Sequence, residues 1–491
     1  MQAIRWSRVW WFSKSPAALA ASLVCVAAQA ATIEPELAGR LARDNGAQRY
    51  PVILRLTQQA DPADFAPRVA ALPQALRGGR LLESLHAFNA PLQAALLQDL
   101  AARKAEDVMA LTTVNAVAAH LQAKDIRDLA KRTEVASIRY DLGLLAPSRR
   151  LMGDPCRPER PTPRQRLPKS CREDARPSAP AVATAFDAQR PGAAPVQSVG
   201  APAAWQAGFT GKGVTVAVID TGIDAAHPDL AGSFRGGASD WFDVHGEHKR
   251  PVDRHGHGTQ IAGLVVGTAA SGQTLGVAPQ ARWIAARIYN DRNVGRLSQL
   301  HRIMAWLLDP DGNPATADAP QIVLNAWGLG DRPGTCDDEF ARDLRWLRAA
   351  GMHVVFAAGN GGPSENSSVS PANNSGALAV GALDGSGQPA LFSSRGVSAC
   401  DARPYPDLLA PGELLRTTDL SAGGIATTTV GTGTSYAAAL VSGELALLVQ
   451  ARPNLSVAER EALLRDVAGD ARPTLVRALG LGASATRERQ P

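Results

Sequence analysis

The sequence predicts an α/β protein with a doubly wound, mostly parallel sheet and flanking helices, preceded by a small α+β domain. Two observations carry this prediction. First, continuous apolar runs recur after residue 198, which is typical of buried parallel strands, at 213–220, 321–327, 352–360 and 377–383. Second, helical stretches such as 338–351 lie between these runs, and strands that alternate with helices indicate a parallel sheet. We expect this domain over about residues 198–480, with a disordered tail at 481–491.

The N-terminal stretch has the three parts of a secretory signal peptide. Arg5, Arg8 and Lys14 form a basic start, the apolar run 17–28 is too short to span a bilayer, and Ala28-Gln29-Ala30 fits the small-x-small cleavage rule. We therefore predict a signal peptide at 1–30 and a secreted or periplasmic protein. An uncleaved anchor is the alternative.

No membrane span is expected after the signal is removed. The richest later apolar stretch, 437–449, carries Glu444 and is interpreted as a buried helix.

Residues 31–141 alternate strand-like and helical patterns. Strands are expected at 50–56, 114–121 and 135–141, and helices at 90–104 and 122–132. This pattern predicts a small α+β domain.

Residues 142–197 are rich in Pro, Arg, Ala and Ser and are predicted to be a linker. Much of the net charge of +5 comes from 149–176, and this stretch has no aromatic residues that could stack on bases. A nucleic-acid partner is therefore not expected.

Four cysteines remain once the signal peptide removes Cys25, and an even count in an exported protein favours disulfides. Three pairings are open. We favour Cys156–Cys171 and Cys336–Cys400, because each pair stays within one region; free thiols are the alternative.

Four polar residues follow or begin predicted elements of the third domain. Asp220 ends a buried strand, Asn360 ends another, and His257 and Ser435 each stand before a helix-like run. Each has a plain structural reading, as a turn, a cap or a loop residue. Together they supply a nucleophile, a base, an orienting acid and an oxyanion donor.

A metal site is the other interpretation of the histidines. His255 and His257 are two apart, and His245 and His248 lie nearby. The sequence has no HExxH and no third ligand at a standard spacing, so no metal ligand is assigned.

The order Asp, His, Ser is that of subtilisin, and the chain resembles the subtilisin-like serine proteases over about 199–449. The matching stretches include "GKGVTVAVIDTGIDAAHPDL", "HGHGTQIAGLVVG", "VVFAAGN" and "GTSYAAALVSG". The resemblance implies a serine endopeptidase that acts on polypeptides, in which Asp220 orients His257, His257 activates Ser435 and Asn360 binds the oxyanion. It also implies that Ala326, Trp327 and Gly328 bind the substrate backbone.

The sequence departs from the family pattern at three places. Tyr436 begins the run Tyr-Ala-Ala-Ala-Leu, where the family has Met-Ala-Ser/Thr-Pro-His, and Ala326 replaces a serine. Ala269 and Ala270 replace the asparagines of the family's calcium loop, and alanine offers no side-chain oxygen to a hard cation. No cofactor is expected, and calcium is left open although the usual loop ligands are missing. A non-catalytic peptide-binding relative and a metal-dependent hydrolase are the rival interpretations.

Residues 31–141 also resemble the propeptide of these proteases. This implies an intramolecular inhibitor whose C-terminal strand lies in the active cleft, with a cut between Asp141 and Val196.

Overall fold

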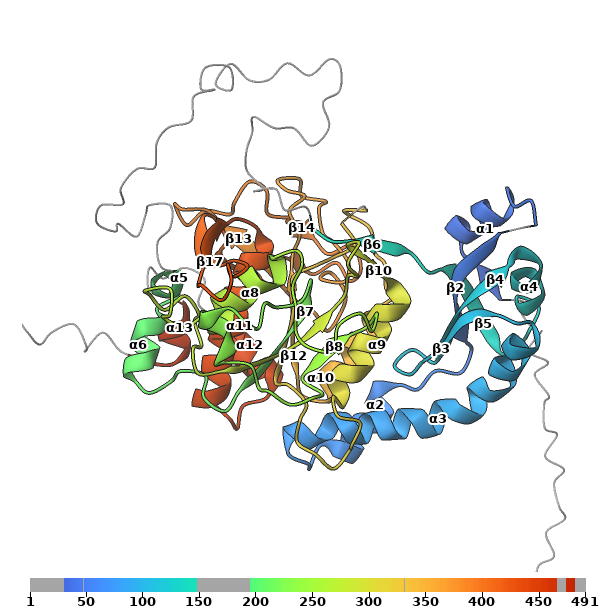
Figure 1. Cartoon of the computed structure of the whole chain (residues 1–491), viewed down its shortest axis with the longest axis horizontal. Coiled ribbons are helices and arrows are strands. Elements are labelled where there is room, and N and C mark those ends of the chain that lie inside the picture. The colour runs from blue at the N-terminus through green and yellow to red at the C-terminus, as the bar shows by residue number, and fades with distance from the viewer. Residues whose placement is uncertain (1–30, 47, 148–194, 331, 466–473, 482–491) are drawn as a thin grey trace, which may run out of the picture.

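The computed structural model describes residues 31–46, 48–147, 195–330, 332–465 and 474–481. An N-terminal α+β part lies beside a larger α/β part, and the long helix α3 extends from the first along the second (Figure 1). The predicted signal peptide, most of the predicted linker and tail, and the Cys156–Cys171 pair fall outside the described residues.

The larger part is built on a seven-stranded sheet with the order β16-β13-β12-β11-β7-β9-β8, in which every neighbouring pair is parallel. This confirms the predicted doubly wound, mostly parallel sheet. The strands are β7 Thr215–Asp220, β8 Trp241–Asp243, β9 Arg282–Arg287, β11 Ile322–Asn325, β12 His353–Ala357, β13 Leu378–Leu383 and β16 Leu408–Pro411.

Helices cover both faces of this sheet, which explains why its strands are apolar at successive positions. In β7, Val216 and Val218 pack into the core on one face, and Ala217 and Ile219 pack into the core on the other. Helices α8 His257–Val266 and α11 Thr434–Ala451 lie on the first face, and α9 Leu297–Leu308 and α10 Ala341–Ala349 lie on the second. The shorter helices are α5 Pro195–Ser198, α6 Ala201–Gln206, α7 Pro228–Ala231, α12 Val457–Arg465 and α13 Thr474–Ala478.

Two antiparallel hairpins and a disulfide complete the α/β part. The hairpins are β14 Gly396–Val397 with β15 Pro404–Tyr405, and β17 Leu415–Thr418 with β18 Thr428–Gly431. Cys336 and Cys400 are bonded in the structure, which is the predicted pairing. That this bond forms in exported protein remains a prediction.

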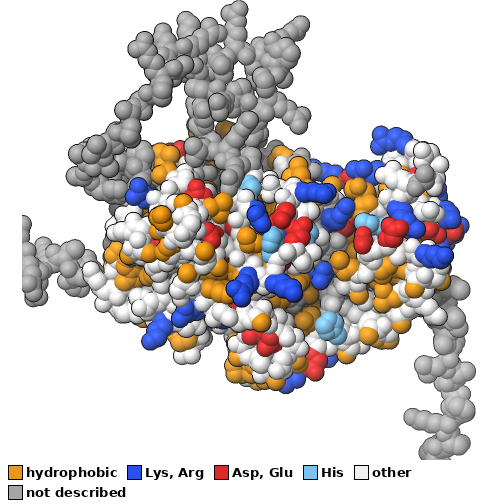
Figure 2. All heavy atoms as spheres, viewed as in Figure 1, with side chains coloured by type: hydrophobic (Ala, Val, Ile, Leu, Met, Phe, Trp, Pro, Cys, Tyr) orange, Lys and Arg blue, Asp and Glu red, His pale blue; other side chains and the backbone are white. Residues whose placement is uncertain are grey.

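The N-terminal part has a five-stranded sheet with the order β1-β5-β2-β4-β3. Its strands are β1 Thr32–Ile33, β2 Arg49–Leu56, β3 Glu106–Leu111, β4 Ala116–Gln122 and β5 Val135–Tyr140, and its helices are α1 Pro35–Leu41, α2 Pro62–Val69, α3 Gln74–Ala102 and α4 Ala123–Leu129. Helices α2 and α3 pack against α10 and α9 of the larger part. On the face shown in Figure 2, basic and acidic side chains are interspersed over both parts.

Both ends of the predicted linker contain regular structure. Residues Gly143–Leu145 form strand β6, which pairs antiparallel with β10 Val294–Arg296 of the α/β part. The linker prediction is therefore wrong for these residues. The prediction rested on local composition. Composition cannot show the backbone hydrogen bonds that hold β6, because they come from a partner strand about 150 positions later in the sequence.

Helix α11 is the described helix that is long and apolar enough to cross a membrane by composition, and 83% of that stretch is buried within the fold. It is the predicted core helix, and Glu444 lies in it with 4% of its surface exposed. Burial raises the pKa of the Glu444 carboxyl to about 8. The sheet-covering helix therefore contains a carboxyl group that burial keeps neutral.

Glu444 makes the stability of the fold depend on pH. Because its pKa is higher in the folded than in the unfolded chain, ionisation destabilises the fold progressively from about pH 4.5 to about pH 8. At about 1.4 kcal/mol for each pKa unit, this reaches at most about 5 kcal/mol at the upper end. We expect Glu444→Gln to flatten the fall of the denaturant midpoint between pH 5 and pH 8, measured on an inactive chain. The exposed Glu365→Gln should keep the parent slope; equal slopes in all three chains would contradict the prediction.

Candidate active site

The structure brings Asp220 and His257 into direct contact. Asp220 is the last residue of β7 and His257 is the first of α8, so both side chains lie at element ends at the carboxyl edge of the sheet. The His257 Nδ1 lies 2.8 Å from Asp220 Oδ1 and 2.9 Å from Oδ2. Because the carboxylate can only accept, Nδ1 carries the hydrogen and Nε2 is left to accept a proton.

A glycine permits this contact. A side chain at Gly258 would place its Cβ 2.0 Å from the Gly222 carbonyl oxygen and 3.2 Å from the Asp220 Cβ. Helix α8 can therefore approach the end of β7 closely only because Gly258 follows His257.

The carboxylate also changes the acidity of the imidazole. Burial alone would lower the pKa of His257, but the charge and hydrogen bond of Asp220 outweigh it and the pKa is raised. The imidazolium that forms when His257 accepts a proton is thus stabilised by a group 97% buried beside it.

Ser435 is the second residue of α11, and its side chain lies at the same edge of the sheet. Its hydroxyl donates to the Ala326 carbonyl oxygen at 3.1 Å, so its single hydrogen is not donated to His257 in this conformation. The expected chain of hydrogen bonds from Asp220 through His257 to Ser435 is thus formed in its first link only. A rotation of the hydroxyl would exchange one acceptor for the other, and such bonds are often loose without substrate.

Asn360, three residues beyond β12, is fixed against the start of α11. Its Oδ1 accepts from the Thr434 N–H at 2.9 Å and from the Thr434 hydroxyl at 3.0 Å. With Oδ1 held in this way, the Nδ2 hydrogens are turned to the other side of the amide. The N–H of Ser435 is in the first helical turn, where no intrahelical acceptor exists. These two donors and the helix dipole can stabilise a negative charge beside Ser435.

The sequence did not reveal the part played by Tyr436. Its ring stands edge-on to the His257 ring, with centroids 6.3 Å apart and planes at 88°. Its hydroxyl donates to Gln260 Oε1 at 2.6 Å, which ties the start of α11 to α8. A Cβ at Gly431 would lie 2.1 Å from this ring, so a glycine is needed there. Tyr436 thus packs the imidazole from the side, in place of the family's methionine.

The predicted substrate-binding residues Ala326, Trp327 and Gly328 directly follow β11, and the side chains of Ala326 and Trp327 face the fold. Ala326 and Trp327 are buried, and the Trp327 ring packs edge-on against Phe340 and Phe356. What this segment can offer to a substrate is its backbone, and that it binds substrate stays a prediction.

Residues 143–147, which follow the N-terminal part, lie near the site. Strand β6 pairs with β10, and the Ala146 N–H donates to the Asn293 carbonyl oxygen at 3.0 Å. One residue further, the backbone of Pro147 is hydrogen-bonded to the His255 imidazole, two residues from His257. The segment thus leads from the N-terminal part toward the Asp220–His257 pair.

Asp141 anchors the start of this segment. Its carboxylate accepts from the Ser298 N–H at 3.0 Å and from the Ser298 hydroxyl at 2.7 Å, in the first turn of α9. A residue of the N-terminal part therefore caps a helix of the α/β part.

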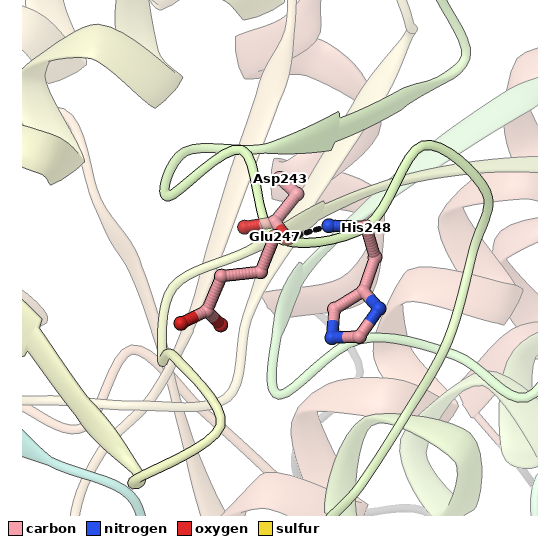
Figure 3. A group of neighbouring side chains, drawn as sticks. All are labelled: Asp243, Glu247 and His248. Atoms are coloured by element: carbon pink, nitrogen blue, oxygen red, sulfur yellow. Dashed lines mark hydrogen bonds between the residues drawn. The ribbon is translucent and has the colours of Figure 1, made fainter.

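The histidines near the site are held by protein groups. His245 Nε2 contacts the Ile288 carbonyl oxygen, and His248 Nε2 lies 2.9 Å from Asp291 Oδ1. Asp243, the last residue of β8, lies together with Glu247 and His248 of the following loop (Figure 3). The Arg287 guanidinium, 99% buried, donates to Asp243 and Glu247, so a fixed positive charge already balances these carboxylates. This arrangement does not favour the metal-dependent interpretation.

The family's calcium loop keeps some oxygen ligands here and lacks others. The buried Asp229 Oδ1 accepts from the Ser271 N–H at 3.2 Å and the Thr268 hydroxyl at 3.3 Å, and Ala269 and Ala270 contribute no oxygen from their side chains. Asp229 Oδ2 and the Ser271 hydroxyl are buried without a hydrogen-bond partner among the described residues, so the loop retains two oxygens that a cation could use. No step below is derived through calcium. Calcium at this loop stays open, as the sequence left it.

Comparisons with known proteins agree with the resemblance seen in the sequence. A sequence model of the Subtilase family matches residues 211–482. Bacillopeptidase F of Bacillus subtilis is 36% identical over 295 residues, which cover 56% of this chain and 20% of that protein. The serine protease AprX of Bacillus subtilis is 34% identical over 281 residues, covering 52% of this chain and 62% of that protein. A subtilisin of Bacillus pumilus is 33% identical over 266 residues, covering 54% of this chain and 86% of that protein.

Proposed function

The chain belongs to the subtilase family, and we propose that it is an exported serine endopeptidase, made as a precursor that its own N-terminal part inhibits. The contact between Asp220 and His257 carries this proposal. An imidazole oriented by a buried carboxylate, next to a serine at a helix N-terminus, is the arrangement that activates a hydroxyl as a nucleophile.

The reaction would proceed through an acyl-enzyme. The Ser435 hydroxyl turns from the Ala326 carbonyl to His257, gives its proton to Nε2 and attacks the carbonyl carbon of the scissile bond. The Ser435 N–H and the Asn360 amide stabilise the oxyanion, and His257 passes the proton to the leaving amine. Water then attacks the ester with His257 again as base, which releases the acid and restores Ser435.

The N-terminal part would act as the inhibitor. Strand β6 pairs antiparallel with β10, in the way that extended peptides bind the edge of a sheet. Because Pro147 is already at His255, the bond that is cut would lie on the C-terminal side of Pro147, within the interval predicted from the sequence. Export would follow from the signal-like residues 1–30 and suits a bonded Cys336–Cys400 pair.

A fluorophosphonate, which reacts covalently with activated serines, tests the proposed activity. We expect one label for each chain, located on the peptide that contains Ser435, and complete loss of cleavage of an unstructured protein substrate. A metal chelator should leave the rate of substrate cleavage unchanged during a short incubation.

Two results would contradict the proposal in different ways. An unlabelled, inactive chain would point to the peptide-binding alternative, and inhibition by the chelator without labelling would point to the metal-dependent one. Mass mapping of the labelled peptide separates Ser435 from other serines of α11.

A further inference from the structure

The connection between the C-terminal end of α9 and β11 gathers three carboxylates. Asp309 directly follows the last residue of α9, and Asp311 and Asp318 lie in the connection to β11. One carboxylate oxygen from each of the three lies within 4.8 Å of the others. None of these residues takes part in the proposed reaction.

Asp309 is the unusual member of this cluster. Only 8% of its surface is exposed, and its Oδ1 is buried without a hydrogen-bond partner among the described residues. Its Oδ2 faces α3, because a Cβ at Gly79 would lie 3.4 Å from that oxygen. A buried carboxylate oxygen without a donor is strongly unfavourable, so the folded chain needs something at this point.

The carboxylates surrounding Asp309 add to the need for positive charge. Asp309 is buried beside the carboxylates of Asp311 and Asp318, and its carboxyl group lies within hydrogen-bonding reach of Asp311. Asp311 accepts from the Asn313 N–H and the Thr316 hydroxyl, and Asp318 accepts from the Asp311 N–H. These donors are neutral and leave the three negative charges in place.

The nearest arginine is used elsewhere. Arg235 donates to the backbone oxygen of Asp318 and forms an ion pair with Asp240. In the Asp243 cluster, by contrast, the guanidinium of Arg287 lies on the carboxylates themselves. The two clusters have similar acids, but among the described residues no arginine or lysine forms an ion pair with the three carboxylates at Asp309, and Arg235 acts on Asp311 and Asp318 only as a nearby charge.

We propose that Asp309, Asp311 and Asp318 bind a calcium ion, with the unpartnered Asp309 Oδ1 as one ligand. Oxygen-only donors select hard divalent cations, and an irregular loop suits the flexible coordination of calcium better than the strict octahedron of magnesium. The ion would join the end of α9 to the loop against which α3 packs.

Calcium binding to the full chain carrying Ser435→Ala, in which self-cleavage cannot alter the sample, tests this site. We expect calorimetry to show a Kd on the order of 10⁻⁴–10⁻³ M, as in extracellular calcium modules. Asp309→Asn and Asp318→Asn should each bind one ion fewer, or bind it roughly tenfold more weakly. Comparing variants separates this site from any other calcium site.

Melting temperatures supply a second readout, because the difference between Asp309→Asn and the parent should change sign between chelator and calcium. In chelator, Asp309→Asn should melt at or above the parent temperature, because it removes repulsion between carboxylates. In calcium the order should reverse. The control Glu247→Gln, in the cluster already balanced by Arg287, should bind calcium like the parent.

Three outcomes would overturn the site. They are a parent that binds no calcium, an Asp309→Asn chain that binds as well as the parent, and a melting difference that follows pH but ignores calcium. The last would mean that Asp309 and Asp311 share a proton. If Asp309→Asn does not fold, the less buried Asp318→Asn decides.

Discussion

Replacing Ser435 by alanine should leave a chain that folds, loses only its signal peptide and cleaves no substrate. The change removes one oxygen whose hydrogen bond is to the Ala326 carbonyl, so the fold should lose little. Removing the nucleophile should lower kcat by on the order of 10⁶, the loss that this change causes in a subtilisin. The same loss should abolish the cut beyond Pro147.

The processing of the parent chain should then be intramolecular. Because β6 already holds the segment beside His257, no bimolecular encounter is needed, an advantage of roughly 7–11 kcal/mol in favourable cases. Intact-mass measurements after expression in a protease-deficient host should show fast cleavage that is nearly independent of protein concentration for the parent and none for Ser435→Ala. Ser442→Ala, in the same helix with its hydroxyl on the Ala438 carbonyl, is the matched control and should be processed normally. A Ser435→Ala chain shortened at the same site and rate would assign the cut to another protease.

The sequence predicted those features whose signal is local. Buried parallel strands are apolar on both faces, so β7, β11, β12 and β13 appear as apolar runs. Asp220, His257, Asn360 and Ser435 stand where polar residues interrupt such runs, and the structure places all four at one edge of the sheet.

Features that depend on distant contacts could not be predicted. A helix was expected at 90–104, because a proline such as Pro91 usually starts or breaks a helix. The observed helix α3 begins at Gln74, and the buried residues Leu85 and Leu96 hold it together on either side of Pro91. Strand β6 forms only by pairing with the distant strand β10. The core position of Trp327 is set by its packing against Phe340 and Phe356, which lie elsewhere in the sequence. No pattern in the sequence shows that Asp309 Oδ1 lacks a partner.

Glu339 joins the two parts of the molecule through a buried ionic network. Its Oε2 accepts from Arg55 of β2 at 2.8 Å and from Arg139 of β5, and its Oε1 lies 2.8 Å from His301 Nε2. His301 Nδ1 lies 2.9 Å from Asp343, so both ring nitrogens face carboxylates and both carry hydrogens. Two arginines of the N-terminal part therefore meet at one carboxylate of the α/β part, and Arg139 also pairs with Asp337.

The charges of this network should not change over the physiological range of pH. Burial alone would lower the pKa of His301, but Asp343 and Glu339 outweigh it and raise the pKa to about 9. Burial would also raise the pKa of Glu339, but the His301 hydrogen bond and the arginine charges hold it far below its usual range. His301 stays charged below about pH 9 and Glu339 stays charged down to strongly acidic pH. Mild acidification is therefore not expected to release the N-terminal part through this network.

Glu339→Gln should instead release it at every pH. The amide keeps the shape but leaves Arg55, Arg139 and His301 facing no full negative charge at this point, and breaking a buried ion pair by removing one partner costs about 3–5 kcal/mol. For processed enzyme, inhibition by added N-terminal part, residues 31–147, should weaken roughly 10²- to 10⁴-fold, because that free energy is lost from the docked state. Asp338→Asn removes an exposed charge from the neighbouring residue, and this variant should be inhibited like the parent.

The inhibition constants of the parent and both variants at pH 5 and pH 8 test this prediction. If Glu339→Gln is inhibited as tightly as the parent, the backbone pairing of β6 with β10 holds the N-terminal part in place and the arginines contribute little. If the parent itself is not inhibited, the N-terminal part is not an inhibitor at all.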